Sequence, residues 1–128
     1  MAVSKELGRE GERYAAKLLR KRGYKILSTN YTCKLGEIDI IALHKKERCI
    51  CFVEVKARSS ADHGGSLYAI GRAKMRQLAR VAAFYIAERK PEKFDYRFDA
   101  VLLDSEGEGG ITGGEVLQNI FSLEEIER

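Results

Sequence analysis

The feature that most restricts the fold is the run at residues 48–58, which reads R-C-I-C-F-V-E-V-K-A-R. Side chains alternate between the two faces of a β-strand. In this run Ile50 and Phe52 fall on one face, and Cys51 and Val53 fall on the other. A strand that is apolar on both faces lies inside a sheet covered on both sides. The sequence therefore predicts an α/β domain with this strand at the centre of its sheet.

Hydrophobic periodicity around this run predicts the other elements. Apolar residues at helical spacing indicate two amphipathic helices, at 5–22 and 72–89. Alternating or apolar runs bounded by turn residues indicate strands at 24–33, 36–43, 48–58, 96–103 and 115–121. The predicted order is α-β-β-β-α-β-β, which gives a mixed sheet with helices packed on it. A single domain spanning residues 1–128 is expected from this length.

Charge is divided unevenly along the chain. Residues 1–103 contain 22 Lys and Arg against 12 Asp and Glu, whereas residues 104–128 contain 1 against 7. The basic part suits a polyanionic partner that offers phosphate groups. A merely solvated surface is an equal alternative on charge alone.

Several classes of protein are disfavoured. No apolar run approaches the roughly 18 residues that span a bilayer, so no membrane partner is expected. The charged N-terminus lacks the apolar segment of a signal peptide, and a cytoplasmic location is expected. The odd number of cysteines, with no export signal, argues against a disulfide framework, and Cys49 and Cys51 are expected to be strand residues. Neither His44 nor His63 completes a zinc-binding pattern.

Two charged side chains interrupt the apolar character of the central strand. Glu54 and Lys56 continue the face that carries Ile50 and Phe52. A charge buried without a partner costs several kcal/mol, so something must compensate both groups.

The preceding strand supplies a partner for this pair. Alternation places Asp39 on the face opposite to Ile38 and Ile40, and pairing of the two strands brings Asp39 close to Glu54. Two adjacent carboxylates repel each other. They can share a proton, pair with Lys56, or bind a hard divalent cation such as Mg²⁺. A purely structural ion-pair network at a strand end is the alternative.

The first helix contains a further unexpected acid. Glu12 lies on or beside the apolar stripe, where a carboxylate is rare unless it is paired. Gly8 and Gly11 each cost this helix roughly 1 kcal/mol relative to Ala, and close backbone approach at a site would explain them. Glu12 is therefore a candidate metal ligand, directly or through water, with a surface ion pair to an Arg as the alternative.

Three motifs together resemble a known superfamily. They are G-R-E-G-E in the first helix, G-E-I-D-I-I in one strand and F-V-E-V-K-A-R in the next. The pattern of Asp39, fourteen residues, then Glu54-Val55-Lys56 resembles the PD-(D/E)XK nucleases. The closer likeness, almost end to end, is to the YraN-type family of small bacterial proteins described as endonuclease-like. Archaeal Holliday-junction resolvases are similar over the first helix and the hairpin only.

This resemblance implies a restriction-endonuclease-like fold with the order α-β-β-β-α-β. It implies that Asp39, Glu54 and the carbonyl of Val55 bind Mg²⁺ or Mn²⁺. It also implies that Lys56 is the catalytic lysine and that Glu12 is the acid contributed by the helix. Ile38 stands in place of the Pro of the superfamily's name, at a position that varies widely.

Further basic residues are candidates for contacts with nucleic acid. Arg72, Arg76 and Arg80 recur every fourth residue on the second helix, where a solvated face is the alternative. Lys74 is in phase with the apolar face of that helix, so it either reaches the carboxylates or a phosphate, or extends to water. Arg58 follows Lys56 and is expected to border the same cleft.

The sequence thus favours a metal-dependent nuclease acting on nucleic acid, with DNA preferred over RNA and branched intermediates as candidate substrates. The alternative is a nucleic-acid-binding module whose nuclease site is weak or inactive. A homodimer is expected only by analogy with branch-cutting nucleases, which act as symmetric pairs. Elsewhere in the chain, Arg97 and Asp99 share a strand face and are expected to form a structural ion pair.

Overall fold

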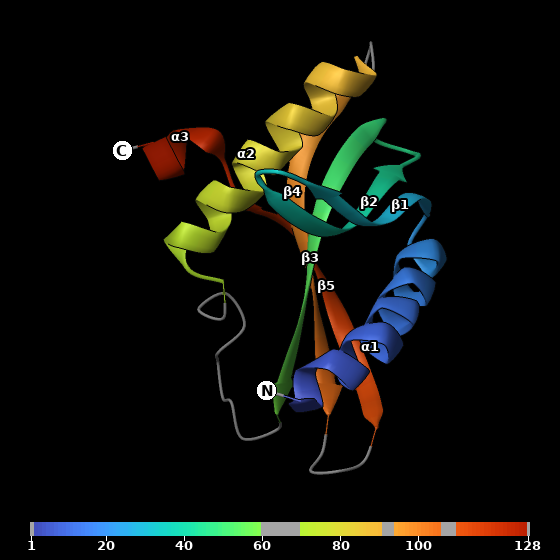
Figure 1. The fold of residues 1–128 in the computed structure, drawn as a ribbon. Coiled ribbons are helices and arrows are strands. Elements are labelled where there is room, and N and C mark those ends of the chain that lie inside the picture. The colour runs from blue at the N-terminus through green and yellow to red at the C-terminus, as the bar shows by residue number, and fades with distance from the viewer. Residues whose placement is uncertain (1, 60–69, 91–93, 106–109, 128) are drawn as a thin grey trace.

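The computed structural model of this chain describes residues 2–59, 70–90, 94–105 and 110–127. Its elements are α1 (Ala2–Lys21), β1 (Tyr24–Cys33), β2 (Gly36–His44), β3 (Cys49–Ser59), α2 (Arg72–Arg89), β4 (Asp95–Ser105), β5 (Ile111–Phe121) and α3 (Leu123–Glu127). Figure 1 shows this arrangement. The predicted mixed α/β class and the element order are confirmed.

The five strands form one sheet in the order β1-β2-β3-β4-β5. Strands β3 and β4 are parallel, and all other neighbouring pairs are antiparallel. A parallel pair requires a crossover connection, and α2 lies between these two strands in the sequence. The run that is apolar on both faces is therefore the central strand, as the sequence predicted.

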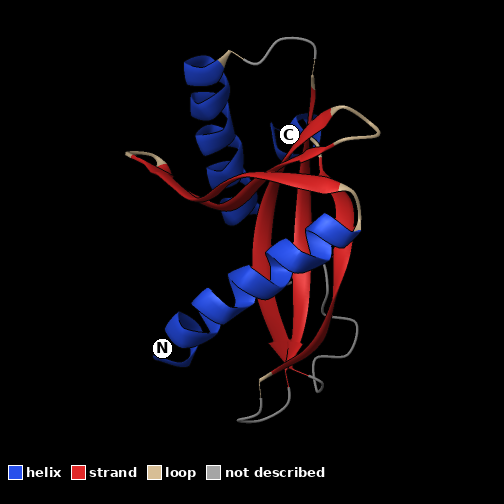
Figure 2. Cartoon of the chain, turned by 90° about the vertical axis from the view of Figure 1, so that its right-hand side faces the viewer, coloured by secondary structure: helices blue, strands red, loops and turns tan. Residues whose placement is uncertain are grey.

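The two long helices cover opposite faces of the sheet. Leu19 of α1 packs with Cys51 and Val53 in one apolar cluster. Leu78 of α2 packs with Phe52 in a second cluster. Figure 2 shows α1 crossing one face of the sheet with α2 behind it. The alternation within β3 thus divides its side chains between two cores, and both faces of the strand are buried.

Strand β2 separates from β3 part-way along its length but stays paired with β1. Its pairing with β3 ends at Ile40 opposite Val53, whereas its pairing with β1 continues to Gly36. The free part of the β1–β2 hairpin curves over α2 in Figure 1. Ile38 consequently packs in the α2 cluster while Ile40 packs in the α1 cluster. The prediction that these two side chains share a face was wrong, because the strand twists away where its second neighbour is lost.

Helix α3 and the first residues of β5 were not predicted from the sequence. Helix α3 has only five residues, too few for a periodic signal. Ile126 attaches it to the α2 cluster, and Arg72 donates a hydrogen bond of 3.0 Å to the carbonyl oxygen of Glu125. Within the described ranges, no helix combines the length and apolar character needed to cross a bilayer.

Candidate functional site

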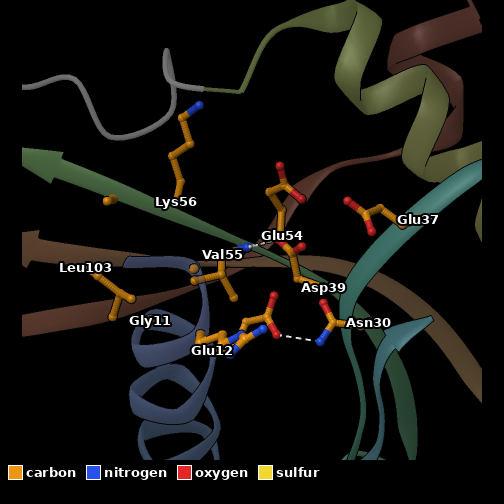
Figure 3. A pocket seen from close by; sticks show the side chains of 12 residues that line it. Gly11, Glu12, Asn30, Glu37, Asp39, Glu54, Val55, Lys56 and Leu103 are labelled. Atoms are coloured by element: carbon orange, nitrogen blue, oxygen red, sulfur yellow. Dashed lines mark hydrogen bonds between the residues drawn. The ribbon is translucent and has the colours of Figure 1, made fainter. Parts of the chain in front are cut away.

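A pocket of about 640 Å³ lies at the fork where β2 separates from β3. Its walls come from the first half of α1 and from strands β1, β2, β3 and β4. Figure 3 shows the side chains that line it. Four residues that the sequence singled out line this one pocket: Glu12, Asp39, Glu54 and Lys56. The fold therefore brings together residues from three separate elements.

Asp39 is held at the fork by the backbone of β3. Its Oδ2 atom accepts a hydrogen bond of 2.9 Å from the N–H of Val55. That N–H lies beyond Ile40–Val53, the last paired residues of β2 and β3, so the carboxylate takes the place of a strand partner. The N–H and C=O of one residue project to the same side of a strand, so the Val55 carbonyl also faces the fork.

Glu54 is a buried acid with incomplete charge compensation. The residue is 8% exposed, and its closest described cation is the Lys74 ammonium on α2, at 3.6 Å. Burial, followed by the negative charge of Asp39, raises the pKa of Glu54 to about 8, and Lys74 opposes this rise. The two carboxylates therefore need either a proton or additional positive charge at neutral pH.

Lys56, which lines the pocket, and Lys74, which pairs with Glu54, have different positions. Lys56 lies on the same side of β3 as Glu54, as alternation predicted, but Figure 3 shows its side chain extending away from Asp39 and Glu54. It is exposed and borders the pocket. Lys74 instead makes the ion pair, which confirms that it lies at the inward edge of α2 and reaches the carboxylates.

Glu12 lines the pocket from the α1 side. Its Oε1 atom accepts a hydrogen bond of 2.7 Å from Nδ2 of Asn30 on β1, visible as a dashed line in Figure 3. Burial raises the pKa of Glu12, and the hydrogen bond from Asn30 opposes the rise. The sequence had offered an ion pair between Glu12 and an Arg as the alternative. In the structure the Asn30 amide takes that place. Asn30 was not assigned a role from the sequence, although its φ of 53° is of the kind that Asn tolerates.

Only one of the two glycines in α1 is explained by close approach. A Cβ atom at Gly11 would lie 3.1 Å from Cδ1 of Leu103, so the helix sits tightly against the sheet there. A Cβ atom at Gly8 would meet no atom of the described residues within 4 Å. The prediction of a close approach is confirmed at Gly11 and was wrong at Gly8.

The donor atoms of the pocket suit a hard divalent cation. Among the described residues, no group of three or more His, Cys, Asp or Glu side chains is placed to hold a metal ion. The donors at the fork are the carboxylates of Asp39 and Glu54 and the carbonyl of Val55, all oxygens. Mg²⁺ binds through one or two carboxylates and keeps several waters, so this all-oxygen set resembles Mg²⁺ or Mn²⁺ ligands more closely than the Cys- and His-rich ligands of most Zn²⁺ sites.

The other basic candidates are dispersed. Arg76 and Arg80 are exposed on α2, whereas Arg72 bonds the backbone of α3. The side chain of Arg58 lies outside the described residues. The structure therefore brings Lys74, but not the arginines of α2, to the carboxylates.

A second acidic cluster lies elsewhere on the sheet. Nε and Nη2 of Arg97 donate to the Asp99 carboxylate at 2.8 and 3.1 Å, which confirms the expected pair. Tyr24 Oη and the Asn119 backbone N–H also donate to Asp99, at 2.8 and 2.9 Å. Desolvation and the neighbouring Asp99 raise the pKa of Tyr24 far above its usual value, so its hydroxyl remains a donor.

Comparison with known sequences identifies the family. Residues 11–103 match the model of the uncharacterised protein family UPF0102. The chain belongs to the UPF0102 family. This is the YraN-type family that the motifs indicated. The matched segment contains four charged residues that line the pocket: Glu12, Asp39, Glu54 and Lys56.

Individual UPF0102 proteins are similar over most of their length. The protein of Syntrophotalea carbinolica is 45% identical over 102 residues, which is 80% of this chain and 81% of the relative. The protein of Alkaliphilus metalliredigens is 47% identical over 97 residues, or 76% and 83% of the two chains. For Caldicellulosiruptor saccharolyticus the identity is 41% over 117 residues, covering 91% and 98%.

Proposed function

We propose that this protein is a divalent-metal-dependent nuclease that hydrolyses phosphodiester bonds in nucleic acid. The observation that carries this proposal is the pair Asp39 and Glu54, which meet at the fork of the sheet with one lysine at 3.6 Å from Glu54. An acidic pair with one buried member, Glu54, and too little positive charge gains most from a cation that arrives with a phosphate ligand. The resemblance to PD-(D/E)XK nucleases gives the same residues these roles.

Asp39, Glu54 and the carbonyl of Val55 would hold Mg²⁺ or Mn²⁺. The chemistry that such an ion supplies is polarisation of a phosphoryl oxygen and activation of a water. The hydrogen bond from Val55 fixes Asp39, so the carboxylate does not need to reorganise on binding.

Lys56 acts on the phosphate side of the pocket. Its ammonium is exposed at the rim, where it can contact a phosphodiester without first breaking a buried ion pair. It orients the attacking water and stabilises the negative charge that develops on the phosphoryl oxygens. In-line attack by the water oxygen forms a new P–O bond and breaks the bond from phosphorus to the 3′ oxygen. The water releases a proton to solvent and the 3′ oxygen takes one up, which leaves a 5′-phosphate and a 3′-hydroxyl. Glu12, held by Asn30, would accept a hydrogen bond from a water in the same pocket.

Cleavage assays test the proposal directly. Branched, flapped, single-stranded and duplex DNA, with an RNA counterpart, are incubated with Mg²⁺, with Mn²⁺ or with EDTA. We expect metal-dependent cuts that are lost in Asp39→Asn and in Lys56→Ala. Asp95→Asn and Lys45→Ala make the same chemical changes at exposed residues outside the pocket and should cut normally.

Two results would contradict this function. One is salt-sensitive binding with no cut in either metal, which would favour the binding module instead. The other is cleavage that survives Asp39→Asn, which would point to a contaminating nuclease or a different site. DNA as substrate and action as a homodimer are parts of the proposal that the substrate panel and sedimentation on branched DNA would test.

A further inference from the structure

A second hollow adjoins the pocket and follows α1 away from it. This groove of about 420 Å³ lies between α1 and β1, with Thr29 and Asn30 on the strand side. The helix side contributes four cations: Arg9, Arg13, Lys17 and Arg20. Exposed positive charge therefore lines the helix side of this hollow.

The four cations form one continuous row. Their spacing of four, four and three residues keeps them within an arc of roughly 80° of the helix. Arg9 and Arg20 are separated along the axis by about 16 Å, at 1.5 Å per residue. All four are exposed, and none forms an ion pair with any side chain that the structure describes. The like charges in such a row repel one another. An anion that spans the row would offset this repulsion.

The groove is continuous with the candidate active site. Arg9, Glu12 and Asn30 line both the groove and the pocket that contains Asp39 and Glu54. A chain of phosphates that has one member in the pocket would therefore meet the row of cations directly. A free phosphate or a small phosphodiester would occupy the pocket without reaching Lys17 or Arg20.

We propose that the α1–β1 groove binds the phosphodiester backbone of the nucleic-acid strand on one side of the cleavage position, an inference that rests on the proposed function. A substrate that fills this groove is an extended polynucleotide and not a mononucleotide or a terminal phosphate. Contacts of Arg and Lys with phosphates carry no base recognition, so this surface contributes affinity and direction but no sequence preference.

Matched charge variants test the groove. Arg13→Gln with Lys17→Gln removes two cations, four residues apart, from α1, and Arg76→Gln with Arg80→Gln removes two with the same spacing from α2. Lys45→Gln with Lys46→Gln removes the same charge from the β2–β3 turn. Gln is a good helix former and the helical positions are exposed, so the fold is retained and circular dichroism checks it.

Binding of labelled single-stranded and duplex DNA is measured by fluorescence anisotropy in EDTA over a range of salt concentrations. Each lost phosphate contact reduces the slope of log K against log salt by about 0.7 for a single strand and about 0.9 for a duplex. We expect the α1 variant to reduce this slope by about 1.4 or about 1.8, and the β2–β3 turn variant to leave it unchanged. The proposal is overturned if all three variants weaken binding equally, if only the α2 variant does, or if the wild-type protein binds no DNA.

Cleavage kinetics separate this proposal from the proposed function. With long DNA and Mg²⁺, the α1 variant should raise KM and leave kcat near the wild-type value, while hydrolysis of a small aryl phosphodiester stays unchanged. If DNA is cut and the α1 variant binds and cuts like wild type, the proposal for the groove is wrong and the proposed nuclease function is supported. If no substrate is cut but the α1 variant alone loses salt-dependent binding, the proposed nuclease function is wrong and the groove is supported as a nucleic-acid-binding surface.

Discussion

Two acidic clusters occupy the same sheet with opposite degrees of compensation. Asp99, which is 0% exposed, accepts hydrogen bonds from Tyr24, from the Asn119 backbone and twice from Arg97. Glu54, also buried, has one lysine at 3.6 Å and a second acid beside it. The first cluster is complete within the protein, whereas the second is short of positive charge.

The difference supports a structural role for the first cluster and the proposed metal-binding role for the second. A buried carboxylate whose oxygens all have partners stabilises one packing arrangement and has little capacity left for a ligand. An acidic pair that includes a buried carboxylate and lacks enough positive charge favours binding of an external cation. Mutations in the first cluster should therefore lower the free energy of unfolding. Mutations in the second cluster should lower activity and ligand binding.

The largest effect is expected from breaking the complete cluster. Arg97→Met leaves the Asp99 carboxylate buried without its bidentate partner, which we expect to cost about 3–5 kcal/mol of unfolding free energy. Urea denaturation measures the loss, with Arg76→Met on the exposed face of α2 as a control. A loss below 1 kcal/mol would show that Asp99 does not depend on the guanidinium.

The next effect is on catalysis at the incomplete cluster. Asp39→Asn should lower the cleavage rate by about 100-fold to 1000-fold, as the loss of one preorganised electrostatic group does in other enzymes. Its stability should change little, because the amide oxygen can still accept from Val55. Single-turnover kinetics and denaturation on the same sample provide both readouts. A stability loss as large as that of Arg97→Met would remove the contrast between the clusters.

Divalent cations should stabilise the protein through the incomplete cluster only. At Mg²⁺ concentrations about 100 times the dissociation constant, ligand linkage adds about 2.7 kcal/mol, and the added stability grows with the logarithm of concentration. Thermal melts across a Mg²⁺ series should show this rise for wild type and not for Asp39→Asn. A wild-type midpoint that is insensitive to Mg²⁺ and Mn²⁺ would contradict the metal site.

The last effect concerns pH in the metal-free protein. The pKa of Glu54 is raised from 4.5 to about 8 by burial and by Asp39 of β2, against Lys74 of α2. The folded state therefore holds this proton more tightly than the unfolded state, and its stabilising contribution falls as pH rises from about 4.5 to 8. The slope is at most about 1.4 kcal/mol per pH unit.

Glu54→Gln isolates this contribution. In EDTA, denaturation at several pH values should show a smaller loss of stability between pH 5 and 8 for Glu54→Gln than for wild type. Glu10→Gln, at an exposed acid on α1, is the control for a changed net charge. Parallel pH profiles for wild type and Glu54→Gln would mean that Glu54 is ionised throughout this range.

The site was predictable from the sequence as far as strand alternation reaches. Glu54 and Lys56 share a side of the central strand because the period of a strand is two, and Asp39 lies near them because the hairpin joins adjacent strands. Helical phase placed Lys74 near the inward edge of α2, and the structure decided that it pairs with Glu54. Asn30 gave no such signal, because its partner Glu12 is eighteen residues away on a different element.

By itself, the sequence determined the central strand, the element order, the two faces to be covered and the set of acidic residues, because each of these is encoded in local periodicity. Only the tertiary structure decided that β2 leaves β3 after Ile40, which turns Ile38 to the other core and releases the Val55 N–H for Asp39. It also placed the cations of α1 in a groove beside β1. These features depend on how neighbouring strands and helices twist and pack against one another, and that balance involves contacts between residues far apart in the chain.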